Sequence, residues 1–311
     1  MPRVLVSGSL AYDRIMDFPG LFAAHFVPEK LHTLSLSFQV DTFVENFGGT
    51  AGNIAYNLSL LGVEPVILAT AGKDFEAYRK YLETNHIRSE SIHVVQDDIT
   101  SSAYIVTDKA NNQIAAFYPG VGRVAYGDVQ TEGVALAVVA AGCDEDMKAL
   151  PRLYRTRGVK YVYDPGQHVT ALTGTELLDA ISGASVLFAN DYELGLIVFK
   201  TGLNEAQLLE RVPLIVATLG ERGARLIQKG SDTTVAAVHK DNVVDPTGAG
   251  DAHRAGYVRG LIAGLDPKQC ARLGATVAAY AVESYGTQNH RFTIEALKAR
   301  YEKAYAEKLS L

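Results

Sequence analysis

The sequence is poor in the residues that cross-link small secreted folds or anchor chains in membranes. Its 311 residues include two cysteines and no tryptophan, and Cys143 and Cys270 show no CxxC spacing. This argues against a disulfide framework or a structural zinc site, and two free thiols suit a reducing cytoplasm. No apolar run approaches the roughly 18 residues that span a bilayer, and the start MPRVLVSGSL is interrupted too soon for a signal peptide. We therefore expect a cytoplasmic protein with no membrane partner.

An excess of positive charge is also missing. The 29 Lys and Arg residues face 35 Asp and Glu residues, so the formal net charge is -6 at pH 7. Nucleic-acid surfaces are usually basic, and we expect no nucleic-acid partner. Apolar residues make up 48% of the chain and charged residues 21%, which is ordinary for a globular protein with one large core and a smaller appendage.

What the sequence does contain is a regular alternation of short apolar runs with helix-like segments. Helices are expected at 50–61 and 74–85, and from 250 to about 305 the chain reads as mostly helical. Apolar runs that predict strands lie at 3–7, 65–70, 134–140, 159–163, 186–189 and 214–218. This order predicts an α/β fold with a mostly parallel sheet flanked by helices on both faces.

Two regions break this rhythm. Apolar and polar residues alternate in 31–47 and in parts of 91–117, which is typical of strands with one face in water. We expect a small β-sheet lid formed by about 14–46 and 96–120, attached to a single domain over 1–311. An apolar stripe in the first region would either pair two lids in a homodimer or cover the active site; its members are Leu34, Leu36 and Phe38.

The segment most indicative of chemistry is 243–256, VVDPTGAGDAHRAG. The small residues Gly248, Ala249 and Gly250 precede Asp251 at the start of an expected helix. Backbone N–H groups at such a helix start approach an anion closely and stabilise charge on a transferring phosphoryl group. Asp251 stands where a carboxylate can accept a hydroxyl proton as general base. The spacing alone also fits a Gly-rich turn before a helix that binds no ligand.

The same segment closely resembles the C-terminal signature of the ribokinase-like (PfkB) carbohydrate and nucleoside kinases. Other segments match this family in order: GSLAYD at 8–13, FGGTAGN at 47–53, NDYE at 190–193 and TLGERG at 218–223. The resemblance covers about residues 3 to 290. It implies a ribokinase-like three-layer fold with a β lid, ATP as phosphate donor and Mg²⁺ as cofactor.

The resemblance also implies which residues bind the acceptor. The acceptor sugar would be held by Asp13, Gly48, Gly49 and Asn53, with Asn53 bonding a hydroxyl. A carboxylate that grips two vicinal hydroxyls suits a ribose. Plainer interpretations stay open at this point, because Asp13 also fits a turn or cap residue and the two glycines fit a tight strand-to-helix turn.

Donor and cation sites follow from the same resemblance. The residues implied for ATP are Asn190, Thr218, Gly220 and Gly223. Glu193 would hold water around Mg²⁺, although it also fits an ordinary surface position on a helix, and Thr218 and Gly220 fit a simple strand end. The positions that match a monovalent-cation site are Asp245, Thr247 and Gly286, so potassium activation is a hypothesis.

Several segments resemble the bacterial adenosine kinase and nucleoside kinase branch, among them 31–53, QIAAFYPG at 113–120, YDPGQ at 163–167 and ESYGTQ at 283–288. This implies that Tyr104 and Phe117 flank a purine from the lid, that Gln167 lies near the base, and that the acceptor is the 5′-hydroxyl of adenosine or another purine nucleoside. The two aromatics also fit ordinary inward-facing lid positions. A sugar kinase of the ribokinase or fructokinase type is the alternative function, and a non-catalytic nucleotide-binding regulator is a second one.

One position departs from the family. His253 stands where the family usually has phenylalanine, and a packed helix residue explains it better than a second base. Arg254 fits two roles at this stage: it either reaches phosphates or faces solvent.

Overall fold

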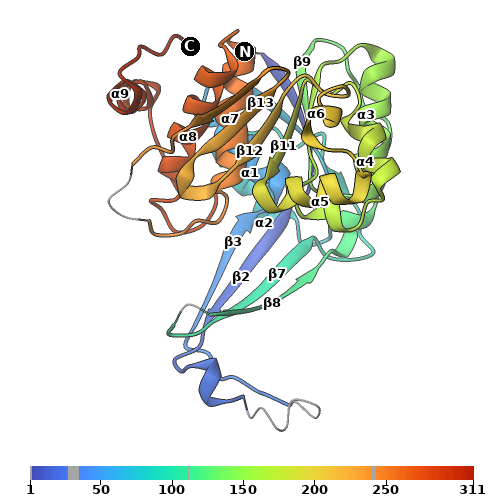
Figure 1. Cartoon of the computed structure of the whole chain (residues 1–311). Coiled ribbons are helices and arrows are strands. Elements are labelled where there is room, and N and C mark those ends of the chain that lie inside the picture. The colour runs from blue at the N-terminus through green and yellow to red at the C-terminus, as the bar shows by residue number, and fades with distance from the viewer. Residues whose placement is uncertain (1, 27–34, 111, 240–242) are drawn as a thin grey trace.

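An eight-stranded sheet forms the centre of the structure, a computed structural model that describes residues 2–26, 35–110, 112–239 and 243–311 (Figure 1). Across the sheet the order is β14 (Ser231–Val235), β13 (Ala224–Gln228), β12 (Ile215–Thr218), β11 (Val186–Asn190), β10 (Tyr161–Asp164), β9 (Val134–Ala140), β1 (Arg3–Ser7) and β4 (Glu64–Leu68). The strands from β12 to β4 are parallel, and β13 and β14 are antiparallel additions at one edge. The predicted mostly parallel sheet is confirmed.

Helices cover both faces of this sheet. One face packs against α1 (Thr50–Leu60), α2 (Glu76–Thr84), α7 (Ala249–Ile262) and α8 (Pro267–Ala281), with α9 (Ile294–Tyr305) against α8. The other packs against α3 (Asp144–Arg157), α4 (Gly174–Ile181), α5 (Asp191–Thr201) and the short α6 (Glu205–Leu208). Strand side chains alternate between the two cores, so Val4 and Val6 join the first and Leu5 the second.

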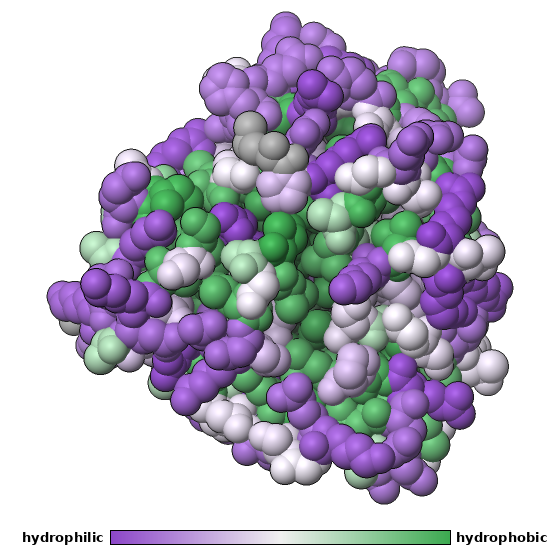
Figure 2. All heavy atoms as spheres, turned by 90° about the horizontal axis from the view of Figure 1, so that it is seen from above, coloured by the Kyte–Doolittle hydropathy of each residue, from purple (hydrophilic) through white to green (hydrophobic). Residues whose placement is uncertain are grey.

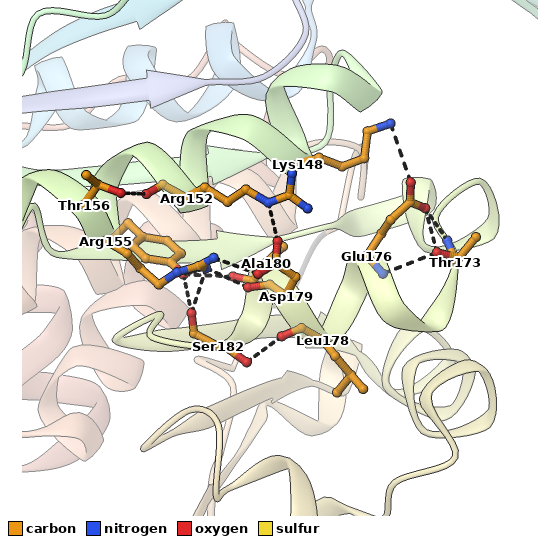
Figure 3. A network of polar contacts seen from close by, with 11 residues as sticks. Lys148, Arg152, Arg155, Thr156, Thr173, Glu176, Leu178, Asp179, Ala180 and Ser182 are labelled. Carbon is orange, nitrogen blue, oxygen red and sulfur yellow. Dashed lines mark hydrogen bonds and ion pairs between the residues drawn. The ribbon is translucent and has the colours of Figure 1, made fainter.

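Polar contacts tie two of the helices on the second face together (Figure 3). Arg155 on α3 donates to the carbonyl of Asp179 at 2.6 Å, to its carboxylate at 2.8 Å and to the carbonyl of Ser182 at 2.9 Å. These acceptors lie at the end of α4, so the guanidinium also satisfies carbonyls that the helix itself leaves unpaired. We assign this network to stability, because none of its residues lines the pockets described below.

A second, four-stranded sheet projects from the main body at the carboxyl ends of the parallel strands (Figure 1). Its order is β3 (Thr42–Gly48), β2 (Ala11–Asp17), β7 (Ser101–Thr107) and β8 (Gln113–Tyr118). A short parallel pair, β5 (Thr70–Ala71) and β6 (His93–Val94), follows β4 of the large sheet and precedes β7 of the four-stranded sheet along the chain. The projecting sheet occupies the region where the lid was predicted. The division of the chain into one domain and a lid stays a prediction.

The strand predicted over 31–47 is wrong for residues 35–40. Residues 31–34 lie outside the described residues, the chain from 35 to 40 forms no strand, and β3 begins at Thr42. Phe38 instead packs at the tip of the sheet, with its ring 4.8 Å from that of Phe18 and 5.1 Å from that of Phe22. Of the predicted apolar stripe, Phe38 is thus partly buried in a local aromatic cluster, Leu36 is exposed, and Leu34 lies outside the described residues.

The end of the molecule away from the four-stranded sheet carries an apolar patch (Figure 2). Seen from above in Figure 2, apolar residues gather in the middle of this end and polar residues surround them. Ligands of open α/β sheets bind at the carboxyl ends of the strands, which here is the end that bears the four-stranded sheet.

Among the described helices, none combines the length and apolar character needed to cross a membrane.

Candidate active site

The start of α7 has the geometry of an anion site. Gly248 is the N-cap residue and adopts φ 77°, a conformation that favours glycine. A Cβ there would lie 3.0 Å from the side chain of Thr287, which would have to shift slightly to admit it. No side chain caps the helix. The first-turn amides after Gly248, at Ala249 and Gly250, therefore lie at the positive end of the helix dipole, as predicted.

Asp251 lies in this first turn and is held by a chain of hydrogen bonds. Asn53 donates from Nδ2 to Asp251 Oδ2 at 2.8 Å. Gln288 Nε2 donates to Asn53 Oδ1 at 3.0 Å and to the Tyr78 hydroxyl at 2.8 Å, and Tyr78 donates to the carbonyl of Gly48 at 2.8 Å. The predicted base is thus connected to the glycine turn of the predicted acceptor site.

Asn53 is the central residue of this chain of hydrogen bonds. Its side chain is buried, and both ends of its amide are engaged, one with Asp251 and the other with Gln288. Asn53 therefore bonds the predicted base directly, and its contact with a substrate hydroxyl stays a prediction.

Two carboxylates at this end of the sheet have raised pKa values. Burial raises the pKa of Asp251 to about 6, against the opposing effects of Arg254 and the Asn53 hydrogen bond. Burial also raises the pKa of Asp13 to about 6, with a further contribution from Asp245. Perturbed carboxylates of this kind are enriched at functional sites.

Asp13 lies against the glycine turn. A Cβ on Gly48 would overlap Asp13 Oδ2, and the register of β2 and β3 places Asn46 directly opposite Asp13. Gly49 adopts φ 86°, and a Cβ there would lie 2.5 Å from the carbonyl of Ser9. The tight-turn interpretation therefore holds for Gly49, and its contact with a substrate stays a prediction.

A pocket of about 400 Å³ lies between the four-stranded sheet and the turn after β10. It is lined by Phe117 on β8, by Ser101 on β7 and by Gln167 in the 3₁₀ turn Gly166–Thr170, with Ser9 and residues around Cys143. The structure thus brings two of the predicted base contacts, Phe117 and Gln167, to one cavity.

Tyr104 does not face this pocket. In the antiparallel register of β7 and β8, Phe117 lies opposite Ala103, and Tyr104 lies opposite Ala116. Successive strand residues point to opposite faces, so the two aromatic rings are on different sides of the sheet. Tyr104 instead accepts a hydrogen bond from Arg14 Nη1 at 2.8 Å. The prediction that both rings flank one purine is wrong for Tyr104.

A second pocket, of about 450 Å³, adjoins the start of α7. Thr218, Gly220 and Gly223 line it together with Gly250 and His253. Gly223 adopts φ 93°, and a Cβ there would overlap the carbonyl of Val235, so the turn cannot carry a side chain. The structure brings three of the predicted ATP residues to the helix start that carries Asp251.

The other two donor-side residues form the start of α5. Asn190 is its N-cap and accepts from the Glu193 amide at 2.8 Å, while Glu193 Oε2 accepts from the Asn190 amide at 2.8 Å. Both therefore serve a capping box. Glu193 is partly buried. Across 2–26, 35–110, 112–239 and 243–311, no cluster of three or more His, Cys, Asp or Glu residues is arranged to hold a metal ion.

Within the predicted monovalent-cation site, Asp245 bonds the other two residues, Thr247 and Gly286. Its carboxylate accepts from the amide of Thr247 at 2.9 Å and from the amide of Gly286 at 3.0 Å. The loop before α7 and the turn after α8 are thereby linked. Cation binding here stays a prediction.

Comparisons with known proteins agree with this geometry. The family model described as pfkB family carbohydrate kinase matches residues 1–293. The chain belongs to this family. A nucleoside kinase of Methanocaldococcus jannaschii is 30% identical over 97% of this chain and 98% of its own, and one of Methanothermobacter thermautotrophicus is 35% identical over 81% and 83%. The nucleoside kinase of Burkholderia thailandensis, solved with inosine, has a TM-score of 0.88 and 34% identity over 98% of this chain and 99% of its own, and has also been solved with ADP-inosine.

These relatives confirm the ribokinase-like fold class of this pfkB kinase. They also make it a phosphotransferase that acts on a hydroxyl group. The predicted roles of individual residues are a separate question, and each one stays a prediction.

The departure at His253 has a structural explanation. The side chain is 6% exposed and lies against α8, where a Cβ on Gly274 would be 2.9 Å from His253 Cδ2. Burial, with a further effect of Arg254, lowers the pKa of His253 to about 3 despite the nearby backbone of Ala271. A ring packed between two helices of the kinase agrees with the packing interpretation, and its lowered pKa favours the neutral form.

Sequence reasoning missed several residues of the site. Tyr78 was seen only as part of a helical pattern. Gln288 and Asp164 lie within ESYGTQ and YDPGQ, segments that carried the family resemblance, but no role was attached to them. Asn46 lies two residues before Gly48 on β3, on the same face of the sheet as Asp13. Strand alternation is the only sequence signal that could have indicated this position.

Proposed function

We propose that this pfkB kinase transfers the γ-phosphoryl group of ATP to the 5′-hydroxyl of a nucleoside, with adenosine and other purine nucleosides as acceptors. The observation that carries the proposal is the position of Asp251, which is bonded to Asn53 at the acceptor turn and lies one residue from Gly250 at the donor pocket. The Burkholderia thailandensis relative, solved with inosine and with ADP-inosine, supports the same pairing of ligands.

In this mechanism Asp251 accepts the proton of the 5′-hydroxyl as its oxygen attacks the γ-phosphorus. The P–O bond to the β-phosphate breaks, and ADP leaves with the electron pair. Backbone amides at Gly248 to Gly250 stabilise the charge on the transferring group. Asp13 accepts from the ribose hydroxyls beside Gly48. Phosphoryl transfer of this kind depends mainly on positioning and electrostatics.

The acceptor base would occupy the pocket of about 400 Å³ that contains Phe117 and Gln167. The ring of Phe117 offers a flat apolar face, and the Gln167 amide offers both a donor and an acceptor. A free sugar would leave this pocket unused, which is why we favour a nucleoside over the ribokinase or fructokinase type of substrate.

A substrate panel tests the proposal. With ATP and Mg²⁺, we expect turnover of adenosine, inosine and guanosine, because the base pocket adds binding energy that ribose and fructose lack. Initial rates by ADP release give the comparison, with kcat/KM for each acceptor. Phosphorylation of ribose or fructose with no turnover of any nucleoside would rule out the nucleoside assignment.

Both cation roles are part of the proposal. Mg²⁺ keeps much of its water and usually binds through one or two carboxylates and substrate phosphates, and the single partly buried carboxylate of Glu193 fits that manner of binding. Potassium would bind beside Asp245, whose carboxylate draws the Thr247 and Gly286 amides together. We expect EDTA to abolish turnover and K⁺ to raise it relative to choline. Full activity in EDTA, or equal rates with K⁺ and choline, would refute the respective role.

We further propose that two copies pair through the outer face of the four-stranded sheet, defined by Phe43, Tyr104, Ile114 and Tyr118. These side chains share the face opposite to Asp13 and Phe117, and all are exposed, Phe43 by 60%. Unpaired apolar sheet faces favour association. We expect a dimer in sedimentation velocity and a monomer for Phe43→Lys; a monomeric parent protein would contradict the proposal.

A cytoplasmic location, suggested by two buried free thiols, is testable by cell fractionation.

A further inference from the structure

Arg254 reaches the anion site from within α7. It follows Gly250 by four positions, and helical side chains point back toward the helix start. Its guanidinium therefore lies beside the first turn, where a Cβ on Gly250 would be 2.6 Å from Arg254 Nη1. Arg254 is only 7% exposed, so the solvent-facing alternative left open by the sequence is wrong.

Asp164, the last residue of β10, holds this guanidinium in place. Arg254 Nη2 donates to Asp164 Oδ1 at 2.8 Å, and Arg254 Nε is paired with Asp164 Oδ2. Asp164 is 3% exposed, so the pair is buried on both sides. The pair engages one edge of the planar guanidinium and leaves Nη1 on the other. Among the described residues, no acceptor bonds Nη1.

The charges around Arg254 are mostly negative. Burial raises the pKa values of Asp251 and Glu193, and the positive charge of Arg254 opposes both increases. Both carboxylates therefore lie within its electrostatic reach. With Asp164 these make three carboxylates near one cation. A triphosphate that entered this site would be repelled unless a cation met it, and a guanidinium is suited to phosphate oxygens because its donors are fixed in a plane.

We propose that Arg254 binds the transferring phosphoryl group through Nη1, and that Asp164 is the positioning residue that aims it. The inference rests on the proposed function, since it assigns a further contact to the same transfer step. In that step the 5′-oxygen bonds to phosphorus, its proton passes to Asp251, and the bridging oxygen leaves on ADP. Arg254 stays protonated and neutralises the charge carried by the phosphoryl oxygens.

Asp164 also links this contact to the acceptor side. The turn that carries Gln167 begins two residues after Asp164, at Gly166, so the end of β10 lies next to both the proposed base contact and the guanidinium.

The decisive experiment compares two nucleotides that differ in the γ-phosphoryl group. Binding of ADP and of the non-hydrolysable β,γ-imido analogue of ATP is measured by calorimetry with Mg²⁺ and no acceptor, for the parent and for Arg254→Met. We expect the substitution to weaken the analogue by at least about tenfold and ADP by less than about twofold, because only the analogue presents a γ-phosphoryl group to Nη1. Equal effects on both nucleotides, or none on either, would overturn the assignment.

Turnover supplies the second measurement. We expect Arg254→Met to lower kcat by about 10³-fold, the lower end of what a transition-state arginine contributes, with the nucleoside KM nearly unchanged. Arg254→Lys keeps the charge and should recover part of the rate. Added guanidinium ion should raise the rate of Arg254→Met but not that of the parent.

Loss of a buried charge partner also threatens folding, so a double variant separates the two effects. Arg254→Met with Asp164→Leu removes both charges and leaves none unpaired. We expect this variant to regain thermal stability relative to Arg254→Met while it stays as inactive. Recovery of stability and activity together would show that the pair is structural only. The nucleotide comparison needs no acceptor, so it remains decisive even if the substrate panel fails to find a nucleoside.

Discussion

Asp251→Asn lowers kcat by about 10²- to 10⁴-fold, the usual contribution of a general base, and leaves ATP binding intact. An amide has nearly the shape of the carboxylate but accepts no proton at neutral pH. Its oxygen can still accept from Asn53 Nδ2, which now bonds the carboxylate at 2.8 Å. The helix start, with the amides after Gly248, is unchanged. Single-turnover rates and ATP calorimetry measure the two quantities separately.

The pH profile distinguishes loss of the base from a general loss of activity. The pKa of Asp251 is raised from 3.8 to about 6, and only the carboxylate can take the hydroxyl proton. The parent's kcat/KM should therefore fall with unit slope below about pH 6 and be flat above it, whereas the residual activity of the variant should lack this limb. A variant with rates close to those of the parent would refute the assigned base.

Stability provides the matching control. A carboxyl whose pKa is higher in the folded than in the unfolded protein stabilises the fold at low pH, and this contribution is lost as the pH rises through the folded value. We expect Asp251→Asn to be more stable than the parent at pH 8, by about 2–3 kcal/mol from the pKa difference at most. The two proteins should converge toward pH 4. A variant that is less stable at pH 8 would indicate a damaged fold.

The second large effect is expected at Gly256, where α7 crosses α8. A Cβ on Gly256 would lie 2.7 Å from the Cα of Gly274 and 2.9 Å from the carbonyl of Leu273. Both contacts are to backbone, so the helices must move apart to admit even one methyl group. We expect Gly256→Ala to lower the free energy of unfolding by about 2–3 kcal/mol, as for other overpacked cores. Because α7 carries Asp251 and the anion-site amides, activity should fall as well.

Gly195 is the matched control. It lies in α5, and a Cβ there would meet nothing within 4 Å. Alanine is favoured over glycine in a helix by up to about 1 kcal/mol, so Gly195→Ala should be neutral or stabilising in the same urea titration. The same substitution in two helices thus has opposite expected signs. Equal stabilisation at both positions would show that the crossing tolerates a side chain.

Much of the fold and part of the site could be predicted because the signals are local. The strands at 3–7 and 134–140 appear with the bounds that their apolar runs indicated. The Gly248–Gly250 run before Asp251 was read correctly as a helix start, since Gly248 needs a positive φ. The ordered motifs then led to the family that the comparisons confirm.

The errors came from pairings between distant segments. Tyr104 and Phe117 each alternate within a strand, but which of them shares a face with Asp13 depends on the register of β7 with β8 and β2. The bond from Asn53 to Asp251, 198 positions later in the chain, is also a long-range pairing that no local pattern indicates, although the predicted role of Asn53 toward the substrate stays a prediction. The stripe that includes Phe38 was expected on a strand, whereas Phe38 packs outside any strand, partly buried in an aromatic cluster at the tip.

Arg254 shows most clearly which features the sequence determines and which the tertiary structure decides. By itself the sequence determined the helix start, the place of Asp251 in its first turn and the strand rhythm around them, because backbone conformation and hydrophobic period are properties of neighbouring residues. Only the tertiary structure decided that Arg254 is buried against Asp164, 90 positions earlier in the chain. A long side chain can turn to solvent or to a partner, and the choice depends on whether folding brings a carboxylate to the same strand end.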